Sequence, residues 1–135
     1  MKKIIVLILT ILLFGCSSNI KEDRIDRISI RSIGLGILYP VKITEESIRD
    51  LEAYEISNKD SIDLVKEYIS KLEPSIENRI VEGNIYMVSD FYYKNKKLYT
   101  LRFDKGRIDF DGRVYKKNDT LIEILYRNKI RFGRN

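Results

Sequence analysis

The chain of 135 residues contains no histidine and no tryptophan, and it has only one cysteine. Catalytic arrangements that need an imidazole, such as Ser-His-Asp and Cys-His sets, are therefore excluded. A single cysteine also excludes an internal disulfide and zinc sites built from cysteine and histidine. A carboxylate-based hydrolase stays open as a minor alternative, although no phosphate-binding glycine loop and no paired-acid motif stands out. We therefore expect a protein that is not an enzyme and holds no metal or cofactor.

The single cysteine follows the one long apolar run of the sequence. Lys2 and Lys3 precede residues 4–14, which are apolar apart from Thr10. A helix of that length would rise roughly 16 Å, about half the thickness of a hydrocarbon core. The run is therefore too short to span a bilayer, but a short basic start followed by such a run is typical of a secretory signal.

The residues that end this run resemble the lipobox of bacterial lipoproteins. Leu13-Phe14-Gly15-Cys16 places an aliphatic residue, a variable residue and a small residue before the cysteine. The resemblance implies that residues 1–15 are a lipoprotein signal peptide that is removed. It also implies that Cys16 carries a diacylglycerol and an amino-terminal acyl chain such as palmitate. Two or three acyl chains anchor a protein stably, so the expected location is a membrane of the bacterial cell envelope.

The mature chain divides into residues 16–24, a polar tether, and residues 25–135, which have the length of one domain. The net charge is +5, and the basic residues are interspersed with acids except at Lys94 to Lys97 and from Arg127 to Arg134. No aromatic-basic RNA motif is present, so nucleic acid is not an expected partner. The basic C-terminal stretch either contacts anionic lipid head groups or is an ordinary solvated end of the chain.

The fold class predicted from the apolar pattern is α+β. A helix is expected over residues 57–72, with Ser57 and Asp60 as a capping box and Pro74 as its stop. Its apolar stripe packs on the core and comprises Ile62, Val65, Ile69 and Leu72, with Tyr68 beside them. A second helix is expected over residues 120–129 with Thr120 as its cap, and a last strand is the alternative.

From residue 82 onward the apolar period is two, which indicates strands. The expected core side of the first strand holds Ile85, Met87, Phe91 and Tyr93. An odd loop at Lys94 to Lys96, with a bulge, opposes Phe91 to Tyr99 and Met87 to Phe103, because facing residues must share one side of a sheet. An even loop at residues 105–106 follows. Its expected pairs are Phe103 with Ile108, Leu101 with Phe110, Asp104 with Arg107, and Arg102 with Asp109.

The remaining segments are less regular. Residues 27–31 alternate like a strand, residues 44–47 are suited to start a short helix, and residues 51–56 are suited to an edge strand. Asp111-Gly112 is expected to form a kink or bulge. In total we expect an antiparallel sheet of about four strands with the helix over residues 57–72 packed on one face.

The absence of a catalytic set favours a binding protein of the immunity, inhibitor or accessory-subunit type. The expected partner is another envelope protein or an incoming toxin. The candidate partner surface contains Tyr86, Tyr92 and Arg102, because tyrosine and arginine are enriched at interfaces. The alternative for these tyrosines is ordinary core covered by residues 25–56. A second functional hypothesis is a small-ligand or envelope-glycan site lined by Tyr86, Tyr92, Tyr93 and Tyr99.

Overall fold

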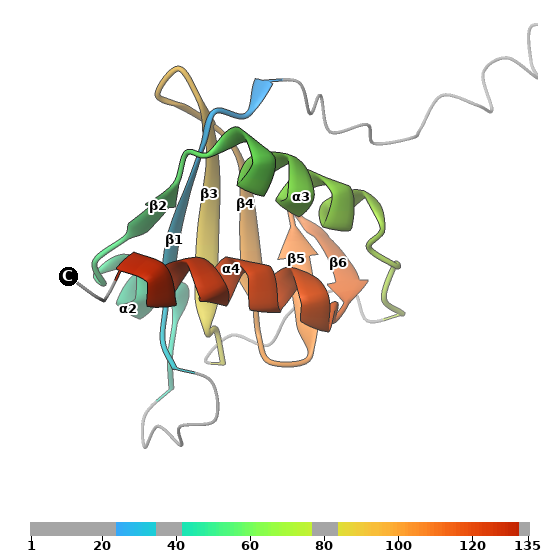
Figure 1. Cartoon of the computed structure of the whole chain (residues 1–135). Coiled ribbons are helices and arrows are strands. Elements are labelled where there is room, and N and C mark those ends of the chain that lie inside the picture. Colours follow the sequence, from blue (N-terminus) through green and yellow to red (C-terminus); the bar gives the residue numbers. More distant parts are fainter. Residues whose placement is uncertain (1–23, 35–41, 77–83, 133–135) are drawn as a thin grey trace, which may run out of the picture.

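The computed structural model describes residues 24–34, 42–76 and 84–132 of the chain (Figure 1). These residues form an α+β fold with one six-stranded sheet in the order β2-β1-β3-β4-β5-β6, in which every neighbouring pair is antiparallel. The strands are β1 (Arg27–Ser32), β2 (Tyr54–Ile56), β3 (Met87–Tyr93), β4 (Lys96–Phe103), β5 (Arg107–Phe110) and β6 (Arg113–Lys116). The helices are α2 (Glu45–Arg49), α3 (Lys59–Ser70) and α4 (Asp119–Phe132).

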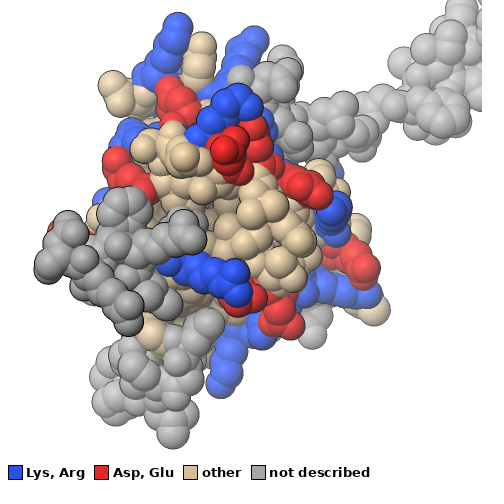
Figure 2. Space-filling view, viewed as in Figure 1, with Lys and Arg blue, Asp and Glu red and all other residues tan. Residues whose placement is uncertain are grey.

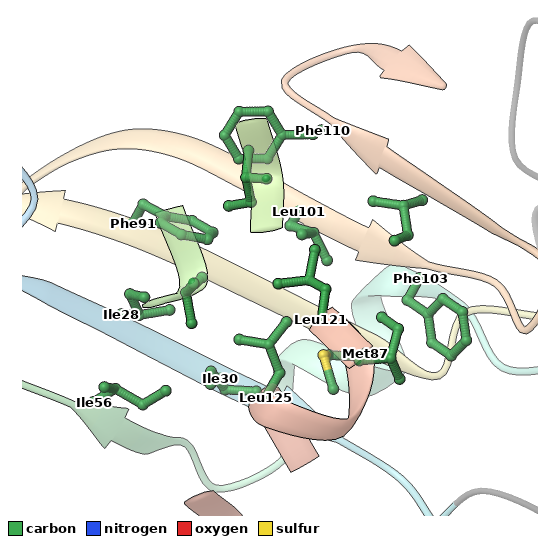
Figure 3. Packing of buried hydrophobic residues seen from close by; sticks show 14 of the residues in the cluster. Ile28, Ile30, Ile56, Met87, Phe91, Leu101, Phe103, Phe110, Leu121 and Leu125 are labelled. Carbon is green, nitrogen blue, oxygen red and sulfur yellow. The ribbon is translucent and has the colours of Figure 1, made fainter. Parts of the chain in front are cut away.

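Helices α3 and α4 lie on the same face of the sheet (Figure 1). Their buried residues belong to one apolar cluster with the side chains that the central strands direct toward them (Figure 3). This main core includes Ile62, Val65 and Ile69 from α3, Leu121, Ile122 and Leu125 from α4, and Ile28, Ile30, Met87, Phe91, Leu101 and Phe103 from the sheet. Burial of this apolar area is the dominant favourable contribution to folding.

An asparagine directly precedes and caps each of the two long helices, and neither is the residue expected from the capping-box pattern. Asn58 caps α3, and its side chain accepts a hydrogen bond from the backbone N–H of Ser61. Asn118 accepts in the same way from the N–H of Leu121 at the start of α4. The short asparagine amide reaches the third N–H after it without a partner acid, so the caps assigned to Ser57 and Thr120 were wrong. The prediction of a last helix over a last strand is confirmed.

The predicted strand registers are confirmed. Met87 pairs with Phe103 and Phe91 with Tyr99, and a bulge after Phe91 offsets the tight turn at Lys94-Asn95, which is one residue shorter than expected. In the second hairpin, Phe103 pairs with Ile108, Leu101 with Phe110 and Arg102 with Asp109, as expected. Asp104 and Arg107 form an ion pair of 3.3 Å beside the turn.

The sheet has six strands where about four were expected. One added pairing follows from Asp111-Gly112, which forms a hairpin turn between β5 and β6 and no bulge. Both turn residues have positive φ, 51° and 84°, a combination that suits Asp-Gly in a two-residue hairpin turn. At the other edge, β2 pairs with β1, which confirms the edge strand within residues 51–56.

A second, smaller apolar cluster lies apart from the main core. It comprises Ile43, Ile48, Ile85 and Val88. Helix α2, capped by Thr44 as the sequence indicated, brings Ile48 onto Val88 of β3. Ile85 was expected beside Met87 in the main core, but it lies in this second cluster. The reason is that β3 begins at Met87, so strand alternation does not extend back to residue 85. Within the described ranges, no helix is long and apolar enough to cross a membrane.

Candidate functional site

The sheet face opposite α3 and α4 carries most of the charged side chains of the central strands, and we call it the outer face. Strand alternation directs one set of side chains from β1, β3 and β4 to the main core and the other set to this face. The outer-face set is Arg27, Ser29, Arg31, Val88, Asp90, Tyr92, Thr100 and Arg102. Helix α2 covers the part around Val88 and contributes two charged residues, Glu45 and Arg49.

Asp90 lies at the centre of the outer face, and its side chain is only 2% exposed. Arg49 holds both carboxylate oxygens: Nη1 donates to Oδ2 at 2.8 Å and Nη2 to Oδ1 at 3.3 Å. The Thr100 hydroxyl donates to Oδ1 at 2.9 Å. Two further cations approach the same carboxylate, Arg31 at 4.0 Å and Lys97 at 3.9 Å. One buried acid therefore organises three basic side chains from β1, α2 and β4.

The surroundings of Asp90 keep it charged. Burial acts to raise its pKa, but hydrogen bonds from Arg49 and Thr100 and the charges of Arg49 and Lys97 outweigh burial and lower the pKa below its ordinary value. The carboxylate is therefore ionised at neutral pH. A proton-transfer role near pH 7 needs a carboxyl group with a raised pKa, so this acid is better suited to hold arginines than to transfer protons.

Glu45 links a second arginine to this network. Its carboxylate accepts hydrogen bonds from Arg49 at 2.9 Å and from Arg102. Arg102 also lies 3.7 Å from Asp109 on β5. Burial acts to raise the pKa of Glu45, whereas the hydrogen bonds from Arg102 and Arg49 lower it, and the net direction is downward. The charged network thus extends continuously from Lys97 across Asp90 and Arg49 to β5.

The cations of this network remain accessible while the central acid is buried. The side chains of Arg31, Arg49 and Arg102 are 26%, 32% and 30% exposed, and that of Lys97 is 48% exposed. Asp90 and Glu45 hold the guanidinium groups of Arg49 and Arg102 through charge-assisted hydrogen bonds, and Arg31 donates to the Leu51 carbonyl at 3.2 Å. The outer face therefore presents an ordered array of arginines. At one end of this array, the guanidinium group of Arg27 lies over the ring of Tyr92, 4.2 Å from the ring centroid.

Two of the three residues of the predicted partner surface share this face, and the third does not. Tyr92 pairs with Lys97 and Arg102 pairs with Val88, so they lie about 13 Å apart along the strands. The placement of Tyr86 on the outward side was wrong, because its side chain packs against the main core. The alternative expectation was that residues 25–56 cover this face as ordinary core. Helix α2, which lies within that range, covers Val88 but leaves the arginines part-exposed.

Sequence reasoning missed the centre of the site. Asp90 was not singled out, although its position midway between Val88 and Tyr92 in the alternating pattern is one signal for the outward side. Nothing in the sequence indicated that Arg49, 41 residues away, binds it. The long separation explains the omission, since helical and strand periodicity describe only local neighbours.

The tyrosines of the glycan-site hypothesis do not gather around one cavity. Tyr99 packs on Phe110 on the main-core side, with ring centroids 5.5 Å apart, whereas Tyr92 faces outward. A pocket of about 450 Å³ lies between the start of β1 and α3. It is lined by Ile25, Asp26, Ser57, Lys59, Ile62, Asp63 and Lys66, without any aromatic residue. Aromatic stacking on a sugar ring therefore has no counterpart in this pocket.

Cys16, the residue predicted to carry lipid, lies outside the described residues. Among the residues that the structure does describe, no group of three or more acidic or cysteine side chains is arranged to hold a metal ion. Comparison of the chain with protein-family models, curated proteins and solved structures finds no match.

Proposed function

We propose that this chain is a lipid-anchored protein of the bacterial cell envelope whose outer sheet face binds another protein, and that it is not an enzyme. The observation that carries the binding proposal is the array of part-exposed arginines around buried Asp90 and its neighbour Glu45. Arginine and tyrosine contribute more than other residues to the affinity of protein interfaces. Side chains that are already ordered lose less conformational freedom on binding, so a smaller entropy cost opposes the favourable contacts.

The chemistry of the outer face favours a partner with an acidic surface. Arg31, Arg49, Arg102 and Lys97 face three acids, Asp90, Glu45 and Asp109, which leaves one unbalanced positive charge on the network. Complementary charge increases the rate of association and fixes the orientation of the partner. Such a surface would suit an immunity protein, an inhibitor or an accessory subunit of an envelope assembly.

The anchoring proposal rests on Leu13-Phe14-Gly15-Cys16 and on the apolar run before it. A thioether to diacylglycerol requires the sulfur itself, so Cys16→Ser should abolish palmitate labelling and leave the signal peptide attached. Neither Ser17 nor Ser18 should substitute, because the hydroxyl group does not enter this chemistry. Labelling that persists in the variant, or a wild-type chain that is secreted without lipid, would contradict the anchor.

The binding proposal is tested with two double variants that each remove two cations. Arg31→Ala with Lys97→Ala alters the outer face, and Lys71→Ala with Lys116→Ala removes exposed, ion-paired lysines elsewhere. The full lipidated chain is used to capture its partner from envelope extract after cross-linking, and affinity for that partner is then measured. We expect the outer-face variant to bind at least about tenfold more weakly, and the control to bind like wild type. Equal binding by both variants, with unchanged melting temperatures, would exclude the outer face.

A further inference from the structure

The turn between β3 and β4 lies at the same end of the molecule as Arg24, where the described chain begins (Figure 1). Two hydrogen bonds hold these segments together. The N–H of Asp26 donates to the carbonyl of Tyr92 at 3.0 Å, and the N–H of Lys94 donates to the Asp26 carboxylate at 2.9 Å. The start of the domain and the tip of this hairpin are therefore one continuous structure, which we call the hairpin end.

The hairpin end is rich in exposed basic side chains. Lys94, Lys96 and Lys97 are all exposed around the two-residue turn, and Arg24 is exposed beside them. Figure 2 shows basic side chains projecting at this end of the molecule. Among the described residues, neither Lys94 nor Lys96 forms an ion pair. Lys94 instead lies 5.3 Å from the centre of the Tyr93 ring.

Three acidic residues at this end already have partners. Asp26 accepts the Lys94 N–H, Glu55 binds Arg27 at 2.7 Å, and Asp63 binds Lys59. Lys94 and Lys96 are therefore left to bind an external anion, whereas Lys97 already lies 3.9 Å from Asp90. Charged lysine and part-buried tyrosine side by side are typical of surfaces that contact lipid head groups, where the ring sits at the boundary and the ammonium group meets phosphate.

The chain that precedes the domain limits what this end can meet. From Cys16 to Arg24 there are eight Cα steps, so even a fully extended chain spans at most roughly 28 Å. If Cys16 carries lipid, as proposed above, the hairpin end is held within that distance of the membrane. The turn at Lys105 lies at the far end of β4, roughly 30 Å further along the strand direction.

We propose that the hairpin end docks on the anionic lipid head groups of the membrane to which the chain is anchored. Each lysine near an anionic surface strengthens such a contact roughly fivefold. The acyl chains already hold the protein at the membrane, and the lysines of the turn fix the orientation of the domain on it. The strands of the sheet then point away from the membrane surface, roughly perpendicular to it. In this orientation the outer face is directed sideways and stays open to a protein partner.

The test uses the full lipidated chain, with its own acyl chains, reconstituted in two kinds of vesicle. One contains phosphatidylcholine alone, and the other contains equal parts of phosphatidylcholine and phosphatidylglycerol. Rates of lysine acetylation are measured by peptide mass spectrometry. We expect Lys94 and Lys96 to react several-fold more slowly on the anionic vesicles only. Lys42 and Lys105, which are also exposed, serve as matched lysines whose rates should not change.

Two additions sharpen the result. Salt near 1 M, where the Debye length is about 3 Å, should remove the protection. Lys97, which is also exposed at the hairpin end, should be protected as well, and the variant Lys94→Glu with Lys96→Glu should remove that protection. Lys42→Glu with Lys105→Glu changes the net charge by the same amount and should leave that protection intact.

The outcomes separate the two proposals. If the protein floats with both kinds of vesicle but Lys94 and Lys96 are unprotected, or are protected no more than Lys105, the docking proposal is wrong and the lipid anchor stands. If the protein does not float with the phosphatidylcholine vesicles, the anchor itself is contradicted, and the docking proposal that depends on it falls as well.

Discussion

The two faces of the central sheet are built on opposite principles. On the main-core side, Phe91, Leu101 and Phe103 are at most 1% exposed and are covered by helices. On the outer face, the same strands carry Asp90, Thr100 and Arg102. Thr100 donates a directional hydrogen bond to Asp90, and Arg102 donates one to Glu45 of α2. Apolar burial is non-directional and tolerates small shifts, whereas a buried carboxylate is stable only while its donors stay in place. The comparison shows that fold stability and the candidate binding surface are supplied by different sides of the same strands.

The largest effect is expected on the main-core side. Phe103 is 1% exposed in the main core, so Phe103→Ala should lower the free energy of unfolding by about 3–5 kcal/mol. The matched control is Leu64→Ala on α3, where the side chain is 41% exposed and the loss should stay below about 1 kcal/mol. Chemical denaturation measures both. A loss below about 1 kcal/mol for Phe103→Ala would mean that the two faces are assigned the wrong way round.

On the outer face, Asp90→Ala should lower the free energy of unfolding by about 2–3 kcal/mol. The variant leaves Arg49 and Thr100 without the acceptor that both now use, and hydrogen bonds to a charged group contribute about 1.5–3 kcal/mol. Unlike Phe103→Ala, it should also weaken partner binding in chains that remain folded, because the arginines lose their fixed positions. If folded Asp90→Ala binds its partner as tightly as wild type, buried Asp90 has only a structural role.

The two faces should lose stability at opposite ends of the pH scale. The pKa of Asp90 is lowered in the folded chain, so its contribution is complete above the unfolded value near 4 and is lost as the pH falls through the lower folded value. Tyr54, whose hydroxyl donates to the Leu125 carbonyl at 2.7 Å, has its pKa raised by burial to about 12. Its contribution is complete below the unfolded value of about 10 and is lost as the pH rises toward 12.

The rise in the pKa of Tyr54 from about 10 to about 12 corresponds to about 2–3 kcal/mol of stability. Each of the two pH effects can be isolated by one substitution. The stability difference between wild type and Asp90→Asn should shrink as the pH is lowered below about 4. Tyr54→Phe should remove the tyrosine-dependent part of the loss between pH 10 and 12. Urea denaturation at a series of pH values measures both, and parallel stability curves for wild type and variant would contradict the corresponding assignment.

The smallest effect concerns Ser89, the one core-side position of β3 that is polar. Its side chain is fully buried, and its hydroxyl has no hydrogen-bond partner among the described residues. Burying an unpaired hydroxyl is unfavourable, so Ser89→Ala should be neutral or should stabilise the chain by up to about 1 kcal/mol. A clear destabilisation, measured by thermal melting, would mean that this hydroxyl finds a partner after all.

Local pattern was enough to predict much of the fold. The period-two alternation predicted the pairs Met87 with Phe103 and Leu101 with Phe110, because a shift of one residue would turn every apolar side chain to the wrong face. The same reasoning failed at Ile85 and Tyr86, which lie just before β3 begins. Asp111-Gly112 was misread because the same dipeptide suits a bulge and a hairpin turn, and only a following partner strand distinguishes them.

The sequence by itself determined the class of the fold, the register of its two long hairpins and the separation of an apolar from a polar side in each strand. Those properties follow from interactions between near neighbours along the chain. Only the tertiary structure decided that β1 lies between β2 and β3, and that Arg31, Arg49 and Lys97 converge on Asp90. The physical reason is that these contacts join distant segments, and their free energy depends on the burial of the whole sheet face, which no local period encodes.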